Sequence, residues 1–300
     1  MSDAPPAPLA RTADWRDPST EVLGIVEFAN VAPLHFGLEE APGTRFVRGV
    51  PTTLNEALRR GEIDLTLVSS VEFVRHRAHY RALPDFSIAT LGPVYSVMLF
   101  HLSPWDELGG ARVAVTPQSA TSVELLRSLL TASGMEADLL PTPGTLDEML
   151  ATSDAALLIG DAALTEAVRH LRPRAEGPAG RGASGLSALN PRLHVTDLGE
   201  AWYRLTRLPF TFAVWASRAD RRPSDELLAR FRAARTYGLG RLAEVAEEES
   251  RRLGLSESIV QRYLENFRYY LEPPDLDGLE EFALRVDPSF RRGELGFWDD

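Results

Sequence analysis

The chain has 300 residues, of which 44% are hydrophobic, so it can bury the core of one large or two medium domains. It has no cysteine, and its 32 Lys and Arg residues are all arginine. Disulfides, cysteine-ligated metals and enzymes that need a lysine Schiff base are therefore excluded. The net charge of −11 argues against a nucleic-acid or anionic-membrane partner and requires a local positive site for any anionic ligand.

Strands and helices alternate through the first hundred residues. Residues 1–20, rich in proline, alanine and charge, are expected to form a disordered arm. Apolar runs predict strands at 22–28, 46–50, 64–68, 88–90 and 95–101. Helical periodicity predicts helices at 33–39, 52–60 and 71–77 between these strands.

The pattern then repeats after a turn at Ser103-Pro104. Strands are predicted at 112–116, 138–140, 155–159 and 193–196, and helices at 121–132, 145–151 and 162–171. Residues 172–192, rich in Gly, Pro, Ala and Arg, are expected to form a surface loop. A strand at 210–216 is followed by helices at 224–242, 244–253, 257–271 and 277–286.

This alternation predicts an α/β protein of two lobes. The extended segments 93–101 and 209–216 bracket the middle unit, so the chain would cross between the lobes twice. We expect one lobe from residues 21–100 plus 210–300, including the C-terminal helices, and a second from residues 101–209. Such an arrangement places a ligand cleft between the lobes, at the carboxyl ends of the strands.

The segment Arg112 to Leu130 contains the strongest functional signal. A short strand runs into a turn rich in hydroxyls, with Thr116, Ser119, Thr121 and Ser122, and a helix begins there. A helix start offers free N–H groups and a positive dipole end, which suit a carboxylate or phosphate. Thr121 and Glu124 alternatively form a capping box, a purely local interaction that leaves two first-turn N–H groups free.

Polar side chains also follow the other predicted strands. They are Asn30, Ser69, Ser70, Ser96 and Asp161. Asn30, Ser70 and Asp161 each have a local alternative, as caps of the helices that follow them. Together these residues are typical of a cleft for a polar small molecule. The residues alone therefore predict a two-lobed protein that binds a small anion, with or without enzymatic activity.

Missing sequence motifs limit which cofactors the chain could bind and where in the cell it could work. No Gly-x-Gly-x-x-Gly motif follows a strand, and the six histidines form no metal-binding pair, His76 and His79 being more typical of solvated side chains. We expect neither a metal nor another cofactor. No apolar run approaches the roughly 18 residues of a membrane span. The first residues lack the pattern of a signal peptide, so a cytoplasmic protein is expected, as a monomer or homodimer.

Six sequence blocks in register resemble the chorismate dehydratases of the futalosine route to menaquinone. They are Val26–Leu34 with its Asn-x-x-Pro-Leu pattern, Leu58–Ser70, Gly92–Phe100, Thr116–Val123, Leu157–Asp161, and Asp197–Trp202 leading to Leu208–Trp215. The resemblance implies a fold like that of type II periplasmic binding proteins, with two mixed sheets flanked by helices and a ligand cleft between the lobes, in agreement with the double crossing. The arm 1–20 and the long segment 172–192 depart from the family, as does Phe73, where a tyrosine is expected.

The resemblance also implies the reaction. Chorismate would lose water by a carbanion-type elimination, giving 3-[(1-carboxyvinyl)oxy]benzoate for menaquinone biosynthesis. Asn30 and Ser96 are the candidate catalytic residues, and the candidate substrate-binding residues are Ser69, Ser70, Ser119, Thr121, Ser122 and Asp161. The base is Asp161, Glu27 or the substrate's own enolpyruvyl carboxylate. We favour the last, because the candidate residues are mostly neutral donors that position rather than titrate.

Three other functions compete with this one. The related 1,4-dihydroxy-6-naphthoate synthase should show a Pro-Asn-Asp-Thr-Phe-like opening and a catalytic histidine in the second lobe, and neither is seen. A solute-binding protein for a small anion would normally carry a signal peptide or lipid anchor. A ligand-sensing domain of a transcription regulator would need a helix-turn-helix unit and a basic face, for which residues 1–20 are too short and too rich in proline.

Overall fold

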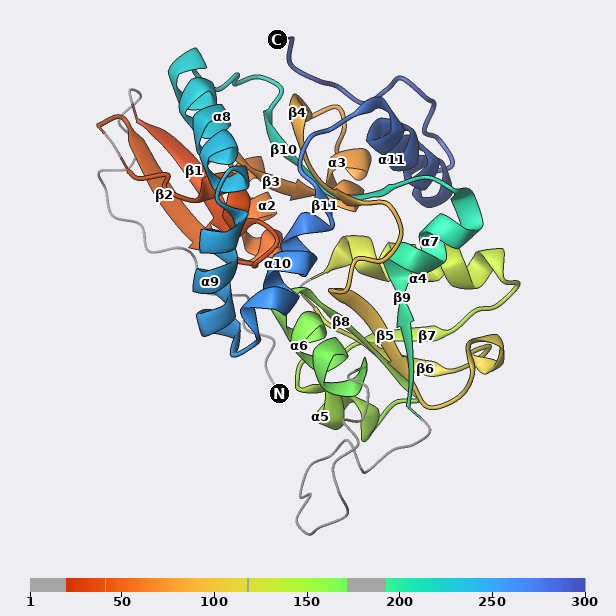
Figure 1. Ribbon diagram of the computed structural model, residues 1–300. Helices are drawn as coiled ribbons and strands as arrows, with labels where there is room; N and C mark the ends of the chain where they lie inside the picture. Colours follow the sequence, from red (N-terminus) through yellow and green to blue (C-terminus); the bar gives the residue numbers. More distant parts are fainter. Residues whose placement is uncertain (1–19, 41, 118, 172–192, 300) are drawn as a thin grey trace, which may run out of the picture.

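The computed structural model describes residues 20–40, 42–117, 119–171 and 193–299. It shows an α/β protein in which two mixed sheets, each flanked by helices, lie side by side (Figure 1). The predicted fold class is therefore confirmed. The predicted arm at 1–20, except for Thr20, and the predicted loop at 172–192 lie outside the described residues.

The first sheet has six strands in the order β11-β4-β10-β3-β1-β2. Strands β1, β2 and β3 are parallel, whereas β10 is antiparallel to both β3 and β4, and β11 is antiparallel to β4. The strands are β1 (Glu21–Val26), β2 (Thr44–Gly49), β3 (Leu65–Ser69), β4 (Tyr80–Thr90), β10 (Phe210–Arg218) and β11 (Phe267–Arg268).

The second sheet has five strands in the order β7-β6-β8-β5-β9. They are β5 (Val97–His101), β6 (Arg112–Val115), β7 (Asp138–Pro141), β8 (Ala155–Ile159) and β9 (His194–Asp197). Strand β5 runs antiparallel to β8 and β9. Because β5 pairs here along its whole length, residues 97–100 belong to the second sheet and not to the first lobe, where the predicted boundary placed them.

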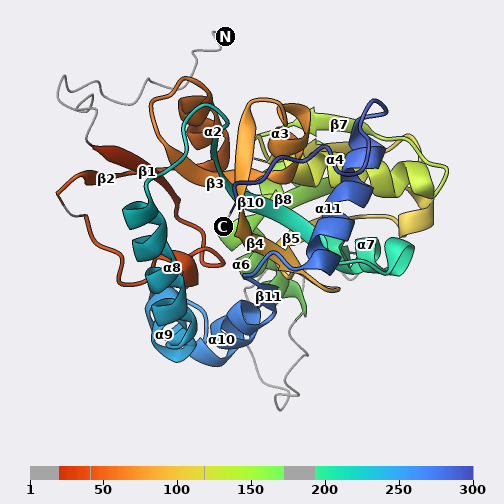
Figure 2. The ribbon, with the colours of Figure 1, turned by 90° about the horizontal axis from the view of Figure 1, so that it is seen from above.

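Helices cover the sheets of both lobes. The first lobe carries α1 (Ala32–His35), α2 (Pro51–Arg59), α3 (Ser70–Arg75), α8 (Asp225–Leu239), α9 (Leu242–Leu253), α10 (Glu257–Glu265) and α11 (Pro273–Val286). The second carries α4 (Ala120–Ala132), α5 (Leu146–Leu150), α6 (Gly160–Leu171) and α7 (Leu198–Thr206). Helix α11 spans the two lobes, because it contacts both α3 and α4 (Figure 2).

Several elements differ from the prediction. Strand β4 has 11 residues instead of three, because Pro84 and Asp85 interrupt its apolar pattern while the strand pairs with β10 on both sides of this irregular stretch. Helix α7 was not predicted, although Asp197 caps it by accepting from the N–H groups of Gly199 and Glu200. The helix predicted at 257–271 ends at Glu265, since residues 267–268 pair with β4, and α11 begins at Pro273.

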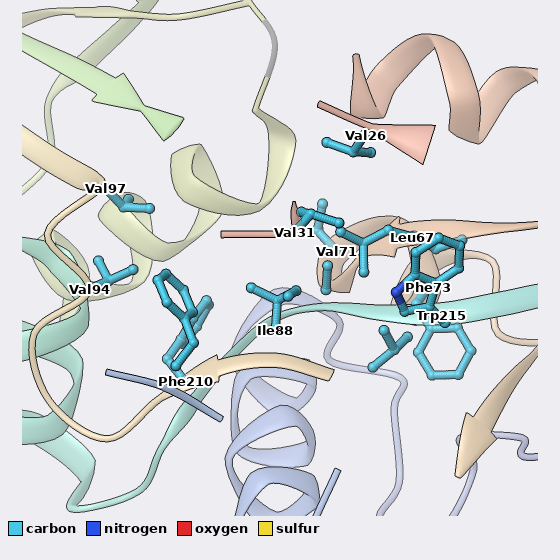
Figure 3. Packing of buried hydrophobic residues seen from close by; sticks show 14 of the residues in the cluster. Val26, Val31, Leu67, Val71, Phe73, Ile88, Val94, Val97, Phe210 and Trp215 are labelled. Carbon is cyan, nitrogen blue, oxygen red and sulfur yellow. The ribbon is translucent and has the colours of Figure 1, made fainter. Parts of the chain in front are cut away.

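A single large hydrophobic cluster runs through both lobes. In Figure 3 Val94 and Val97 lie at one side and Val26 and Leu67 at the other, with Ile88 between them. The lobes are therefore joined by apolar packing.

One carboxylate ties the first crossing between the lobes to the start of α7. Asp197 accepts from the N–H groups of Val94 (3.0 Å) and Tyr95 (2.7 Å) in the first crossing, as well as from the start of α7. Tyr95 has a φ of 62°, a strained value for a non-glycine residue, and the bond from its N–H group helps to hold it there. Burial raises the pKa of Asp197, and its four N–H donors oppose that shift. Asp197 thus fixes the path on which Ser96 lies.

Candidate active site

A cavity of about 220 Å³ lies between the lobes at the carboxyl ends of β1, β3 and β8. Part of its lining is apolar and includes Val26, Leu67, Ile88, Val94 and Val97, which Figure 3 labels. Its polar lining comes from both lobes and consists of Asn30, Thr52, Asn55, Arg59, Ser69, Glu72, Ser96, Ser119, Thr121 and Ser122. Such a mixture is suited to an apolar ring that carries polar substituents.

Six of the eight candidate residues lie in this lining, and two do not. The six are Asn30, Ser69, Ser96, Ser119, Thr121 and Ser122. Ser70 is fully buried behind the cavity, where its hydroxyl donates to the Thr211 carbonyl at 2.5 Å. Asp161 is turned away from the cavity. One of its carboxylate oxygens accepts from the Ala29 N–H at 3.1 Å, and the other pairs with Arg252 at 2.7 Å.

The start of α4 differs from the predicted capping box. The helix begins at Ala120, and the Ser119 hydroxyl accepts from the Ser122 N–H at 3.2 Å. The Thr121 hydroxyl instead accepts from the N–H of Val71 at 3.0 Å, at the start of α3 in the other lobe. Glu124 pairs with Arg75 of α3 at 2.9 Å. The capping-box alternative is therefore wrong. Ser119 caps the helix, and Thr121 and Glu124 contact the other lobe.

Two amide side chains at the cavity have an unused acceptor. Asn30 and Asn55 both line the cavity, and the Oδ1 atom of each is buried with no hydrogen-bond partner among the described residues. Asn30 does not cap α1, whose first flanking residue is Val31 with no side-chain cap. A buried polar atom without a partner costs about 1–3 kcal/mol, so these two oxygens indicate a place where a ligand supplies the missing groups.

One ion pair borders the cavity. Arg59 on α2 and Glu72 on α3 are 2.9 Å apart, and the Tyr80 hydroxyl donates to the same Glu72 oxygen at 2.8 Å. His76 lies 3.7 Å from the other oxygen. Arg59 and Glu72 are the only charged side chains among the described residues that line the cavity.

Ser96 lies where the first crossing enters β5. Its hydroxyl is 3.4 Å from the Val94 carbonyl, and its own carbonyl accepts from the Gly160 N–H at 2.8 Å. The Tyr263 phenol from α10 is buried close by. Burial raises the pKa of this phenol above its ordinary range, and the Ser96 hydroxyl opposes that shift. Ser96 is thus held by contacts with the backbone of Val94 and of Gly160, and the Tyr263 ring is buried beside it.

The candidate base Glu27 also lies outside the cavity. Its exposed carboxylate is 3.3 Å from Arg48, and it lines a second hollow beside α9, together with His35 and Arg252. Phe28 lines both hollows and separates them. Burial and the nearby Arg48 lower the pKa of His35 to about 4, so this histidine is neutral at physiological pH. Neither Glu27 nor Asp161 therefore lines the cavity between the lobes.

Four polar lining residues were absent from the sequence-based candidates: Thr52, Asn55, Arg59 and Glu72. The first three share one side of α2, at the spacing i, i+3 and i+7, which is a usable signal. It was hidden because a polar helix side is most often simply solvated. Among the described residues no group of three or more His, Cys, Asp or Glu side chains could hold a metal ion, and no helix is long and apolar enough to cross a membrane.

Comparison with solved structures supports the fold. The crystal structure of protein AF1704 from Archaeoglobus fulgidus is similar with a TM-score of 0.64 at 18% identity, over 90% of this chain and 97% of that one. The periplasmic aliphatic sulphonate binding protein SsuA from Escherichia coli is similar with a TM-score of 0.60 at 16% identity, over 94% and 92%. These likenesses confirm the predicted periplasmic-binding-protein-like fold.

Comparison of sequences reaches further. A family model described as menaquinone biosynthesis matches residues 22–287. A chorismate dehydratase from Thermus thermophilus is 46% identical over 269 residues, which are 90% of this chain and 96% of that protein. A second chorismate dehydratase, from Campylobacter jejuni, is 24% identical over 70% of this chain and 73% of its own. With so much of its length matched, the chain belongs to the menaquinone-biosynthesis family that includes these chorismate dehydratases.

Proposed function

We propose that the protein is a chorismate dehydratase, which converts chorismate to 3-[(1-carboxyvinyl)oxy]benzoate and water in menaquinone biosynthesis by the futalosine route. The observation that carries this proposal is the 46% identity to a chorismate dehydratase over 90% of the chain. The cavity agrees with it, because a lining that combines apolar side chains with amides and hydroxyls suits a carboxylated ring.

The chemistry begins with loss of the proton at the ether-bearing ring carbon. The electron pair of that C–H bond passes into the ring and its carboxylate, and the C–O bond to the neighbouring hydroxyl then breaks. Because negative charge grows on the ring carboxylate, donors placed there stabilise the transition state more than the ground state. We assign this carboxylate to the start of α4, where Thr121 and Ser122 line the cavity, together with the neighbouring hydroxyl of Ser119.

The base in this proposal is the substrate's own enolpyruvyl carboxylate. Asp161 and Glu27 are held in ion pairs outside the cavity, and the lining carboxylate Glu72 is already held by Arg59 and Tyr80. Asn30 and Ser96 would hold the enolpyruvyl group so that its carboxylate reaches the ring proton, a positioning role. The departing hydroxide takes up that proton as water, so the carboxylate is regenerated.

No further group is needed for these steps, so we propose that activity requires neither a metal nor another cofactor. We also propose a cytoplasmic enzyme, as a monomer or homodimer. A naphthoate synthase of similar fold would need a catalytic histidine, and no histidine is among the described residues that line the cavity.

The direct test is to incubate the purified protein with chorismate and to follow the aromatic product by absorbance and mass spectrometry. We expect a product lighter than chorismate by one water, formed at a rate proportional to the enzyme concentration. Saturable binding of chorismate without any dehydration would instead indicate a cytoplasmic binding protein for small anions.

A further inference from the structure

Arg59 is the only cation among the described residues that line the cavity, in a protein whose net charge is −11. An anionic ligand is repelled by the protein as a whole, so a positive group inside the cavity has a large effect on its binding. The sequence had indicated that such a local positive site was needed, but it had identified only hydroxyls and a helix start.

The contacts of Arg59 show what it can bind. Its guanidinium is 2.9 Å from one Glu72 oxygen, and its side chain is 42% exposed, whereas that of Glu72 is 14% exposed. Glu72 has a second support, because the Tyr80 hydroxyl donates to the same oxygen at 2.8 Å. Glu72 can therefore stay in place without Arg59, while Arg59 holds a carboxylate that a ligand can replace.

Asn55 adds a second donor next to Arg59. It lies one turn earlier on the same helix, is 6% exposed, and lines the cavity. Its Oδ1 atom is buried without a partner, while its Nδ2 atom is 3.4 Å from the Ser69 hydroxyl. The two ends of an amide can be exchanged by rotation, after which Ser69 donates to the oxygen and the NH₂ group is free for a ligand.

The position of this pair indicates which end of a ligand it meets. Val71, the neighbour of Glu72, donates its N–H to Thr121 at the start of α4. Arg59 and Glu72 are therefore beside the helix start to which we assigned the ring carboxylate, but on the opposite lobe. A carboxylate between them would be held from both lobes at once.

We propose that Arg59 and Asn55 form a carboxylate subsite for the ring carboxylate of the substrate, and that Glu72 occupies the guanidinium of Arg59 while the cavity is empty. The proposal rests on the proposed function for the identity of the substrate. When the ligand carboxylate replaces Glu72 on Arg59, the number of guanidinium–carboxylate pairs stays the same. Arg59 is also held in position before the ligand arrives, which lowers the entropic cost of binding.

The test is calorimetric binding of chorismate to the full chain, beside binding of benzoate, which keeps only the ring carboxylate. We expect Arg59→Gln to weaken both by about 10- to 100-fold, as for loss of a charge-assisted hydrogen bond. The matched control is Arg60→Gln, since Arg60 pairs with Glu56 on its own helix and lies outside the cavity lining. It should bind both ligands as the wild type does.

Glu72→Gln separates a binding role from a structural one. Because it removes the competing carboxylate and keeps the shape, chorismate should bind more tightly than to the wild type. If Glu72→Gln weakens binding as much as Arg59→Gln, the ion pair only supports the fold and the proposal is overturned. Unchanged binding of both ligands by Arg59→Gln would overturn it equally.

The same experiment distinguishes this proposal from the proposed function. A wild type that binds chorismate in an Arg59-dependent way but releases no aromatic product keeps the subsite and refutes the dehydratase. If chorismate does not bind, benzoate still judges the subsite, and a wild type that binds neither ligand refutes it. Normal turnover with binding that is insensitive to Arg59 keeps the dehydratase and refutes the subsite.

Discussion

Replacing Asn30 should lower turnover while the stability of the fold stays level or rises. The Asn30 Oδ1 atom is buried at the cavity and has no partner among the described residues, which costs the folded protein about 1–3 kcal/mol. Asn30→Ala removes this unsatisfied atom and leaves only a small void. The melting temperature should therefore stay level or rise by a few degrees, at about 2–4 °C per kcal/mol for a chain of this size.

Turnover should change in the other direction. If Asn30 holds the enolpyruvyl group, Asn30→Ala loses a hydrogen bond to a charged group, worth about 1.5–3 kcal/mol, or roughly a 10- to 150-fold loss of rate. Asn30→Asp should lose more and should also weaken binding, because it sets a carboxylate against a dianion. The measurements are initial rates of aromatic product, calorimetric binding of chorismate, and thermal melts. Near wild-type turnover in Asn30→Asp would remove this residue from the site.

Four further outcomes follow from contacts described above. Thr121→Val should lower the free energy of unfolding by about 1–3 kcal/mol in a denaturant titration, because it leaves the Val71 N–H unpaired. The Ser122 hydroxyl has no such structural contact, so Ser122→Ala should weaken chorismate binding and leave the melting temperature unchanged. An equal loss of stability in both variants would contradict this difference between Thr121 and Ser122. Asp161→Asn should slow turnover less than Asn30→Ala, as measured by kcat, because its carboxylate binds Arg252 and the Ala29 N–H outside the cavity. The folded state holds the pKa of His35 at about 4 against 6.5 when unfolded, so it binds fewer protons between these values and stability falls as pH drops through them. The free energy of unfolding of the wild type and of His35→Gln is measured in melts from pH 7 to pH 4. Over this range the wild type should lose up to about 3 kcal/mol more than the variant, and parallel curves would refute this prediction. Exhaustive chelation should leave turnover intact, and a loss restored by one added metal would refute the proposal that none is needed.

The sequence predicted the fold well where patterns are local. Buried runs such as Leu65–Ser69 and Ala155–Ile159 carry their own signal, and both became central parts of their sheets. Strand β4 was recognised only at its end, because its pairing with β10 tolerates Pro84 and Asp85 in a way that no local pattern shows. Its length is set by its neighbours and not by its own residues.

The site was predictable at strand ends and not beyond them. The rule that polar residues cluster at the carboxyl ends of strands correctly indicated where to look, but it cannot say which way a side chain turns. Asp161 turns to Arg252 of α9, a residue distant in the sequence. Arg59 follows no strand, and it reaches the cavity only because α2 packs beside β3. Tertiary contacts of this kind decided both cases.

The place of β10 in the first sheet has a consequence for synthesis on the ribosome. This strand lies at the centre, between β4 and β3, yet it is made after every strand of the second sheet. In the nascent chain, β3 and β4 therefore cannot be joined in the first sheet until residue 218 has emerged. By then the second sheet already has all its strands. We expect the strands of the second sheet to acquire protection from hydrogen exchange during translation before β3 and β4, which are joined only through β10.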